Sequence, residues 1–393
     1  MPSSMRSEQP RKRLAILITH PIQYYSPVFR ILASRSGLDV CVFFTWEREA
    51  TRYDREFGRS FEWDIPLEEG YDHVFVSNSG SHRRDFMGVR NPGLERHIES
   101  WGADALLVYG WSYLSHLRAM RHFHGRIPVL FWGDSTLIDP MPDWRKSARK
   151  LFLRWVYGSV DKAFYVGTRS REYFKALGFG DDDLSFAPHS VDNSRFASAS
   201  EAAQSRAAEW RSSLGIPEDD VVFLFAGKFI EKKDPLLLME AFKGMACEKS
   251  HLVMVGDGSM RDSMEDVRKG QPRIHIFPFM NQSEMPVAYA MCDVFCLPSK
   301  GPGETWGLAV NEAMACGKAV IVSDRVGCAV DLVKSGENGY VFRSGDRDEL
   351  IEKMSRTLDV SVARSMGLNS RDRIASWNFF SIAESIESAV LHG

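Results

Sequence analysis

Two glutamates, Glu304 and Glu312, flank the start of an expected helix that follows a glycine-rich loop. The helical pattern covers residues 308–316. One carboxylate lies before this helix and the other inside its second turn, so both can face one ligand, and carboxylates bind pairs of sugar or ribose hydroxyls well. The alternative is that the first only favours the helix dipole and the second forms a surface ion pair with Lys318 or Arg325.

The same helix start offers a site for a phosphate oxygen. Backbone N–H groups at Gly307, Leu308 and Ala309 have no partner inside the helix, and the positive end of the helix dipole favours an anion. Earlier in the chain, the apolar run 221–226 leads into a loop that carries Lys228 and Lys233. A diphosphate needs such cations, although a lysine after a strand is usually only a solvated loop charge.

A third loop supports the chemical interpretation of the first two. Residues 251–255 form an apolar run that ends in Val255-Gly256-Asp257-Gly258. The lysine loop, this glycine turn and the two glutamates follow one another in order along the chain. Their occurrence together favours a ligand site over three unrelated surface features.

Metal and cofactor chemistry has no counterpart in the sequence. There is no Asp-x-Asp triplet, and the histidines are scattered. The six cysteines show no CxxC pair or zinc-ligand spacing, and most stand in apolar runs where a thiol packs as a small hydrophobe. We therefore expect no metal and no cofactor, with lysines and a helix N-terminus in place of a divalent ion, and a reducing cytoplasm as the compartment.

Short apolar runs alternate with longer helical patterns, which indicates βαβ units and parallel sheets. The fold class that follows is α/β, with two Rossmann-like domains facing each other across a cleft. Ligands bind beyond the carboxyl ends of strands in such sheets, which is where the loops above lie. The expected strands are 14–19, 40–45, 105–109, 129–132, 163–166, 221–226, 251–255, 274–277, 294–297 and 319–323.

Length and composition agree with two soluble domains. The chain has 393 residues, 44% of them apolar, and no stretch of about 20 apolar residues that could span a bilayer. A formal charge of -3 gives no reason to expect nucleic acid as a partner. Residues 1–13 are polar and basic without an apolar segment, so we expect a disordered tail and no signal peptide.

The second half of the chain resembles the C-terminal domain of the retaining GT-B glycosyltransferases of family 4. Their Glu-x7-Glu signature corresponds to Glu304-Thr-Trp-Gly-Leu-Ala-Val-Asn-Glu312, continued by Ala-Met-Ala-Cys-Gly317. The resemblance also covers Pro188-His189-Ser190-Val191-Asp192 with Phe196, then Val326-Gly327 and Asn338-Gly339. It implies an N-terminal acceptor-binding domain at 14–195, a nucleotide-sugar-binding domain at 196–376, and a last helix, 377–393, that crosses back to the first domain.

The resemblance also implies roles for single residues. Lys228 and Lys233 match the basic pair on the donor diphosphate, although the first position is more often Arg, so a bidentate grip is replaced by a point charge. Glu312 matches the ribose-binding glutamate and Glu304 the one beside the donor sugar. The full implied donor site is Gly227, Lys228, Lys233, Gly256, Phe279, Met280, Glu304, Thr305, Trp306, Gly307, Leu308 and Glu312, and the catalytic candidates are Glu304, Lys228, Lys233 and Asp134.

The first domain departs from the family pattern in two places. Many relatives have a glycine-rich loop after the first strand, whereas this chain has Thr19-His20-Pro21-Ile22-Gln23-Tyr24-Tyr25. An acceptor could pack on these tyrosines, and His20 either contacts it or anchors the loop. Many relatives also place a histidine after the fourth strand, where this chain has Trp132-Gly133-Asp134. Asp134 could take its place or cap a turn. The acceptor candidates are His20, Gln23, Tyr24, Tyr25 and Trp132.

The function expected from this resemblance is metal-independent, retaining transfer of a hexosyl group from a nucleotide-sugar donor to a glycan, lipid-linked or small-molecule acceptor. Two alternatives remain open: a nucleotide-sugar epimerase or hydrolase on the same fold, and a non-catalytic nucleotide-sugar-binding partner of a glycosylation complex. A dinucleotide dehydrogenase does not fit, because no strand is followed by Gly-x-Gly-x-x-Gly.

Residues 143–157 mix five basic residues with several aromatic ones. Such a face can lie on anionic lipid, which would place the protein at the inner face of the membrane. The alternative, which we favour from the sequence, is an ordinary helix that packs its apolar stripe into the first domain.

Overall fold

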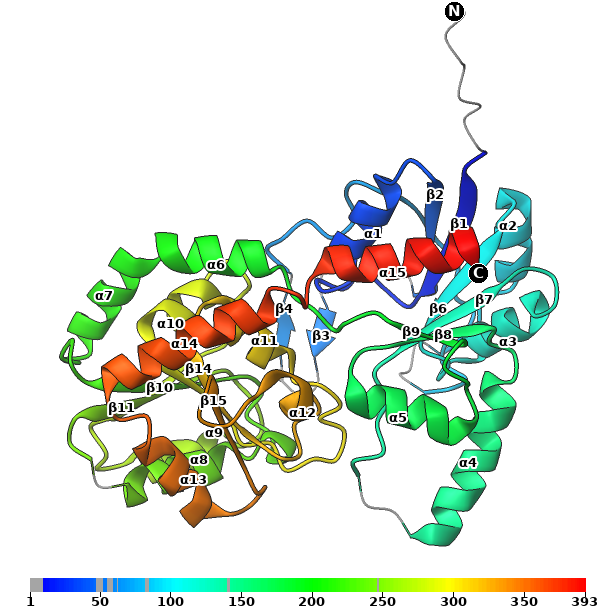
Figure 1. Ribbon diagram of the computed structural model, residues 1–393. Helices are drawn as coiled ribbons and strands as arrows, with labels where there is room; N and C mark the ends of the chain where they lie inside the picture. The colour runs from blue at the N-terminus through cyan, green and yellow to red at the C-terminus, as the bar shows by residue number, and fades with distance from the viewer. Residues whose placement is uncertain are drawn as a thin grey trace, which may run out of the picture.

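The computed structural model describes residues 10–46, 52–54, 59–61, 63–81, 85–139, 142–245 and 247–393. Its two large sheets are both parallel, with seven strands in the first and six in the second. Helices cover them, and the two halves of the chain lie beside each other (Figure 1). The predicted α/β class with two Rossmann-like units is therefore confirmed.

The first sheet has the order β5-β2-β1-β6-β7-β8-β9. Its central strands read as continuous apolar runs because helices cover both faces, as β1 illustrates with five consecutive buried residues. The chain leaves β1 toward β2 on one side and reaches β6 on the other, so the topological switch point lies between β1 and β6. The strands are β1 (Lys12–Ile18), β2 (Leu38–Phe44), β5 (Asp72–Phe75), β6 (Ala105–Tyr109), β7 (Val129–Gly133), β8 (Lys162–Tyr165) and β9 (Leu184–Phe186).

The second sheet has the order β12-β11-β10-β13-β14-β15, and its switch point lies between β10 and β13. The lysine loop follows β10 and the glutamate loop follows β13, so this topology brings the two loops to the same crevice. The strands are β10 (Val221–Ala226), β11 (Ser250–Val255), β12 (Ile274–Phe277), β13 (Val294–Leu297), β14 (Ala319–Ser323) and β15 (Gly339–Phe342). A separate antiparallel pair is formed by β3 (Arg52–Asp54) and β4 (Arg59–Phe61).

The helices of the first half are α1 (Ser26–Ala33), α2 (Leu94–Trp101), α3 (Leu114–Phe123), α4 (Asp143–Tyr157) and α5 (Thr168–Leu177). Those of the second half are α6 (Asn193–Ala202), α7 (Gln204–Ser213), α8 (Pro235–Gly244), α9 (Arg261–Arg268), α10 (Met285–Met291), α11 (Leu308–Ala315), α12 (Ala329–Leu332), α13 (Arg347–Ser355), α14 (Val360–Ile374) and α15 (Phe379–His392), with a 3₁₀ turn, η1 (Glu231–Lys233). In Figure 1, the chain runs from blue to green through the first domain and from green to orange through the second, and the red helix α15 returns to the first.

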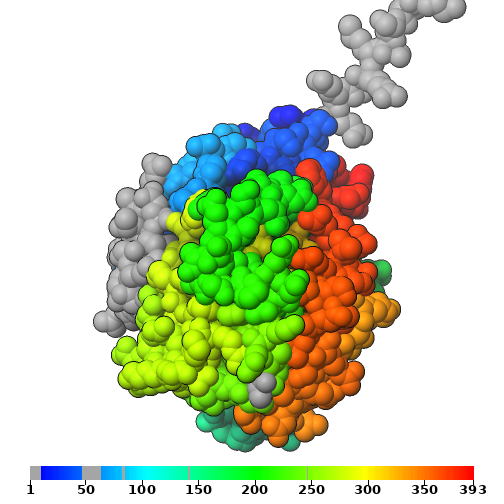
Figure 2. Space-filling model, turned by 90° about the vertical axis from the view of Figure 1, so that its left-hand side faces the viewer, coloured from blue at the N-terminus to red at the C-terminus, as the bar shows by residue number. Residues whose placement is uncertain are grey.

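The first helices and the last helix of the second half of the chain pack on different units. Helices α6 and α7 pack on α10 and α11, so the chain has entered the second unit by residue 193. In Figure 2, the green segment that holds them lies between the yellow region and the red-orange C-terminal region. Helix α15 instead packs on α1, β1 and β9 of the first unit.

Two expectations need correction. Residues 1–9 of the predicted tail lie outside the described residues, but Lys12 and Arg13 belong to β1, where they pair with the start of β2. Helix α4 does not pack its apolar stripe into the domain: Trp144, Leu151 and Trp155 are exposed, by 69%, 73% and 53%. The packing interpretation that we favoured for residues 143–157 holds only for the C-terminal turns, where Leu153, Val156 and Tyr157 are buried, and is wrong for the rest of the helix. Among the described residues, no helix is long and apolar enough to cross a membrane.

Candidate functional site

An ion pair joins the two loops at the switch point of the second sheet. Lys233 Nζ lies 2.6 Å from Glu304 Oε2, and the two side chains are only 17% and 6% exposed. Ser299 Oγ donates a hydrogen bond of 3.1 Å to the same carboxylate oxygen. Burial pushes the pKa of Glu304 upward, but Lys233, Lys232 and the Ser299 hydrogen bond together outweigh it and hold the pKa below its ordinary value. Glu304 is therefore ionised at neutral pH, with a lysine fixed beside it.

Glu312 lies on the buried side of α11, and both of its oxygens accept hydrogen bonds from tyrosines. Tyr289 Oη donates to Oε2 at 2.8 Å, and Tyr24 Oη donates to Oε1 at 3.0 Å. Burial raises the pKa of Glu312 above its ordinary value, and the two tyrosine hydrogen bonds oppose that rise. Tyr24 belongs to the loop after β1, so this contact connects the two domains.

A cavity of about 330 Å³ opens beside Glu312. Its walls come from the loops after β10, β11 and β12, from α10 and α11, and from the loop after β1 of the other domain. Several of the implied donor residues line it, namely Gly227, Lys228, Gly256, Phe279, Met280 and Glu312, together with the acceptor candidates Gln23 and Tyr24. The structure therefore brings together residues that the sequence assigned to separate donor and acceptor sites.

Glycine is required where these loops approach one another. A Cβ on Gly256 would lie 1.9 Å from the carbonyl oxygen of Gly227, so the turns after β10 and β11 can only touch through bare backbone. A Cβ on Gly327 would lie 1.7 Å from the carbonyl oxygen of Thr305. Because no side chain fits at either position, these glycines set the shape of the cavity floor and of the glutamate loop.

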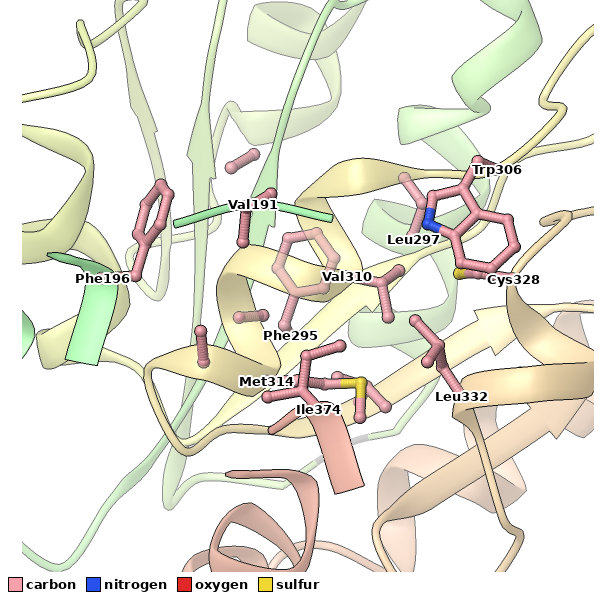
Figure 3. Close-up of a cluster of buried hydrophobic side chains, with 14 of the residues drawn as sticks. Val191, Phe196, Phe295, Leu297, Trp306, Val310, Met314, Cys328, Leu332 and Ile374 are labelled. Atoms are coloured by element: carbon pink, nitrogen blue, oxygen red, sulfur yellow. The ribbon is translucent and has the colours of Figure 1, made fainter. Parts of the chain in front are cut away.

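The remaining donor candidates lie outside the cavity wall. Gly307 caps α11 with φ 100°, and Leu308 begins the helix. Thr305 Oγ1 donates a 2.6 Å hydrogen bond to Asp134 Oδ2 across the domains. Trp306 is buried, and its Nε1 donates to Asn311 Oδ1 at 2.9 Å. Figure 3 shows its ring within a cluster of apolar side chains, near Leu297, Val310 and Cys328. Its indole therefore packs in the core beneath the glutamate loop and does not line the cavity.

The other acceptor candidates of the first domain, His20, Tyr25 and Trp132, lie in two separate places. His20 Nδ1 lies 2.7 Å from Thr19 Oγ1, and its ring stacks on Trp46, an arrangement that fits the loop-anchor interpretation. Tyr25 and Trp132 instead pack against each other with ring centroids 5.0 Å apart. Both also lie against His189, which comes from the loop after β9. The second place thus holds a cluster of rings beside the interdomain contact of Asp134.

His189 places a histidine near Asp134, although this chain lacks one in the loop after the fourth strand. Burial lowers the pKa of His189 to about 4, while the neighbouring Asp134 charge acts in the opposite direction. Its backbone carbonyl accepts a 2.9 Å hydrogen bond from Asn311 of α11. The sequence analysis used His189 only as part of a family segment and assigned it no role in the site.

Other site residues were missed altogether. Tyr289, Gln282, Met285 and Trp63 line the cavity, and none of them follows a recognisable motif. Arg195 holds Gln282 through hydrogen bonds of 3.1 Å to its backbone oxygen and 2.7 Å to its side-chain oxygen. The one signal that could have found Tyr289 is a tyrosine inside an otherwise apolar helical segment, because a buried hydroxyl needs a partner.

Among the described residues, no group of three or more His, Cys, Asp or Glu side chains could hold a metal ion. All six cysteines are free thiols, and five of them are buried.

Comparisons with known proteins agree on the second half of the chain. Residues 207–373, which contain the whole second sheet, match the family described as glycosyl transferases group 1. Over 215 residues, 52% of each chain, the sequence is 28% identical to UDP-Gal:alpha-D-GlcNAc-diphosphoundecaprenol alpha-1,3-galactosyltransferase of Escherichia coli. Over 161 residues, 38% of this chain and 42% of the relative, it is 31% identical to lipopolysaccharide 1,2-N-acetylglucosaminetransferase of Salmonella typhimurium. The chain thus spans about half or less of these relatives' length.

One solved structure extends the similarity to both domains. HepE of Anabaena, determined in complex with UDP and glucose, superimposes with a TM-score of 0.69 over 98% of this chain and 100% of that one, at 14% sequence identity. At this identity the likeness shows the fold alone, and the predicted GT-B arrangement is confirmed.

Proposed function

We propose that this chain is a group 1 glycosyltransferase that moves a sugar from a nucleotide-sugar donor to a hydroxyl acceptor. The observation that carries this proposal is the buried Lys233–Glu304 ion pair at the switch point, on the same loop and helix that place Glu312 in the wall of a cavity large enough for part of a nucleotide. The match of residues 207–373 to the family covers these residues.

The cavity suits a nucleoside diphosphate in several respects. Phe279 and Met280 offer an apolar wall for a base, and Glu312 offers carboxylate oxygens for the ribose hydroxyls. The diphosphate would then extend toward Lys228 and Lys233. Because the Glu304 carboxylate holds Lys233 in place, the ammonium is positioned before the donor binds, so little reorganisation is needed when charge develops.

In the reaction, the bond between the anomeric carbon and the diphosphate oxygen breaks, and that oxygen keeps the electron pair. Lys228, Lys233 and the backbone amides at the start of α11 stabilise the resulting charge. The acceptor oxygen bonds to the same face of the sugar, and its proton passes to the departing diphosphate. Retention of configuration, family 4 membership and independence of a metal ion are parts of this proposal that come from the sequence resemblance.

The acceptor that we propose is a glycan or a lipid-linked glycan, handled in the cytoplasm. The named activities of the two bacterial relatives, on a diphosphoundecaprenol acceptor and in lipopolysaccharide, support this class. The acceptor would approach from the first domain, where the loop after β1 and Asp134 reach the cleft.

A transfer assay tests the proposal. Purified protein is incubated with labelled UDP-glucose, UDP-galactose or GDP-mannose and a bacterial lipid extract, with and without EDTA. Sugar transfer with retained configuration is the expected result. Release of free sugar or epimerised donor without acceptor would favour the hydrolase or epimerase alternative, and donor binding without turnover would favour a non-catalytic partner.

The matched variants use two lysine–glutamate pairs. Lys233→Met with Glu304→Gln removes the buried pair, and we expect transfer to fall by about a hundredfold or more, as loss of charge stabilisation at a reaction centre typically does. Lys243→Met with Glu240→Gln removes an exposed pair on α8 and is the control. Equal activity of both double variants would contradict the site assignment.

A further inference from the structure

Helix α4 presents an apolar stripe to solvent. At 3.6 residues per turn, Trp144, Ala148, Leu151, Phe152 and Trp155 share one face. All five are exposed. The residues that attach the helix to the domain, Leu153, Val156 and Tyr157, lie on the opposite face and are buried. Most of the stripe therefore faces solvent, and the Phe152 ring also contacts Trp111, with ring centroids 5.6 Å apart.

Basic side chains flank the stripe. By the same helical spacing, Arg145 lies along one side of it and Arg154 along the other. Arg149 and Lys150 lie further round the helix, in line with Val156 and Tyr157, and all four basic residues are exposed. Over its 15 residues the helix carries a single acid, Asp143, whose carboxylate is paired with Lys146 at 3.2 Å. Arg121 of α3 adds a further guanidinium, 3.7 Å from the centre of the Trp155 ring. The charge around the stripe is strongly positive, in a chain whose formal net charge is -3.

The stripe also has a defined position relative to the cleft. The loop before α4 is tied to the donor domain, since Asp134 accepts from Thr305 and Asp139 Oδ2 accepts from the Gly303 amide at 2.9 Å. Leu137, in the same loop, is 55% exposed. Figure 1 shows α4 at the lower edge of the first domain, projecting from the body of the molecule. Leu137 thus adds one exposed apolar side chain to the loop that makes these interdomain contacts.

We propose that the outward face of α4 binds the surface of an anionic lipid bilayer. The arrangement has the properties of a helix that lies in the membrane interface: tryptophans at both ends of an apolar stripe, and arginine and lysine beside it to meet lipid phosphates. The inner leaflet supplies such anionic lipid. With α4 on the bilayer, the first domain, which on the proposed function receives the acceptor, is held at the surface where a lipid-linked acceptor lies.

A partner protein or a second copy of the chain could cover the same stripe, but it would not explain the basic residues beside it. An apolar protein interface is depleted of charge at its core and has no need of basic residues on both sides of a narrow stripe. Positive charge on both flanks instead matches a surface that is uniformly negative in every direction, which a bilayer of anionic lipid provides.

Vesicle flotation tests the surface directly. The full-length protein is mixed with vesicles of phosphatidylcholine alone, or of phosphatidylcholine with phosphatidylglycerol, and its distribution is measured. We expect binding to the anionic vesicles only. Trp144→Ser with Leu151→Ser should weaken that binding by about tenfold or more, because two exposed apolar side chains no longer enter the interface. Arg149→Glu with Lys150→Glu should weaken it by at least as much.

The control replaces exposed apolar residues elsewhere: Leu368→Ser with Phe380→Ser, which lie on α14 and α15 and are 63% and 65% exposed. This variant should float like the wild type. The proposal is overturned if the wild type ignores anionic vesicles, or if the α4 variants and the control bind equally. It is also overturned if light scattering shows a dimer that the α4 variants dissociate. Nucleotide binding, measured on the same variants, should not change, so failure here is separable from failure of the transferase proposal.

Discussion

The Tyr24 hydroxyl lies 3.0 Å from Glu312 Oε1, although the two residues are separated by 288 positions in the chain. Tyr24 comes from the loop after β1 and Glu312 from α11. One hydrogen bond therefore joins the proposed acceptor domain to the carboxylate that we propose binds the ribose. Tyr289 occupies the other carboxylate oxygen at 2.8 Å. In this structure, the Tyr24 hydroxyl stands where a ribose hydroxyl would donate its hydrogen bond, and Tyr289 holds the carboxylate from its buried side.

Donor binding should therefore compete with Tyr24. In Tyr24→Phe, the carboxylate oxygen is released, and we expect nucleoside diphosphate to bind about fivefold more tightly, the equivalent of a hydrogen bond of ~1 kcal/mol. Tyr289→Phe is the contrasting variant: this hydroxyl is buried behind Glu312, and its loss should weaken binding. Isothermal titration calorimetry measures both. Weaker binding by Tyr24→Phe would instead make that hydroxyl a donor ligand.

The buried Glu312 carboxylate should destabilise the folded protein at neutral pH. Because burial raises its pKa in the folded state, its contribution to stability is greatest below the pKa of the unfolded chain and is lost as the pH rises through the folded pKa. Glu312→Gln should therefore melt at the same temperature as the wild type or higher at pH 7, while nucleotide binding is lost. The gain should vanish below about pH 4, where the wild-type carboxyl is protonated in both states. A lower melting temperature at pH 7 would refute this prediction.

The Lys233–Glu304 pair should show strong coupling. Lys233→Met leaves the Glu304 carboxylate buried without its partner, and we expect a loss of about 3 kcal/mol in the free energy of unfolding. Adding Glu304→Gln should restore most of that stability, because the uncompensated charge is gone, but not transfer activity. Urea denaturation of the two single variants and the double variant measures the coupling. Additive losses would show that the pair does not behave as a buried unit.

His189 should make the fold sensitive to acid. Burial lowers its pKa from 6.5 to about 4, so its contribution to stability is present above pH 6.5 and is lost as the pH falls toward 4, by on the order of 3 kcal/mol in total. His189→Phe keeps a ring against Trp132 and should flatten the stability profile between these values. His392→Phe, at the exposed C-terminus, should leave the profile unchanged. The same slope in both variants would argue against a buried, neutral His189.

The central strands of both sheets were predictable because they are buried on both faces and read as continuous apolar runs. The strands β5, β9 and β15 were not predicted, because they are short and only partly buried and so lack that signal. The positions of the lysine loop and the glutamate loop were predictable as well, because the loops after the two strands at the switch point of a doubly wound sheet lie side by side. Lys233 and Glu304 meet for this reason, 71 positions apart.

What could not be predicted depends on tertiary packing. Nothing local indicates that Tyr24 would reach Glu312, or that Tyr289 would lie behind it, because these contacts arise only when the domains and α10 are in place. Helix α4 has apolar residues on two faces, and the pattern alone does not say which face meets the domain. Three buried residues at its C-terminal end, Leu153, Val156 and Tyr157, decide the orientation.

The central claim, that the cavity beside Glu312 binds a nucleoside diphosphate, is tested most directly by thermal-shift titration with UDP, GDP, ADP and dTDP, with and without EDTA. A ligand that binds only the folded state raises the melting temperature by mass action. We expect one of the four to stabilise the wild type and the control Glu337→Ala equally, whether or not EDTA is present, and to leave Glu312→Ala unshifted. No shift of the wild type with any nucleotide, or an equal shift in Glu312→Ala, would contradict the account.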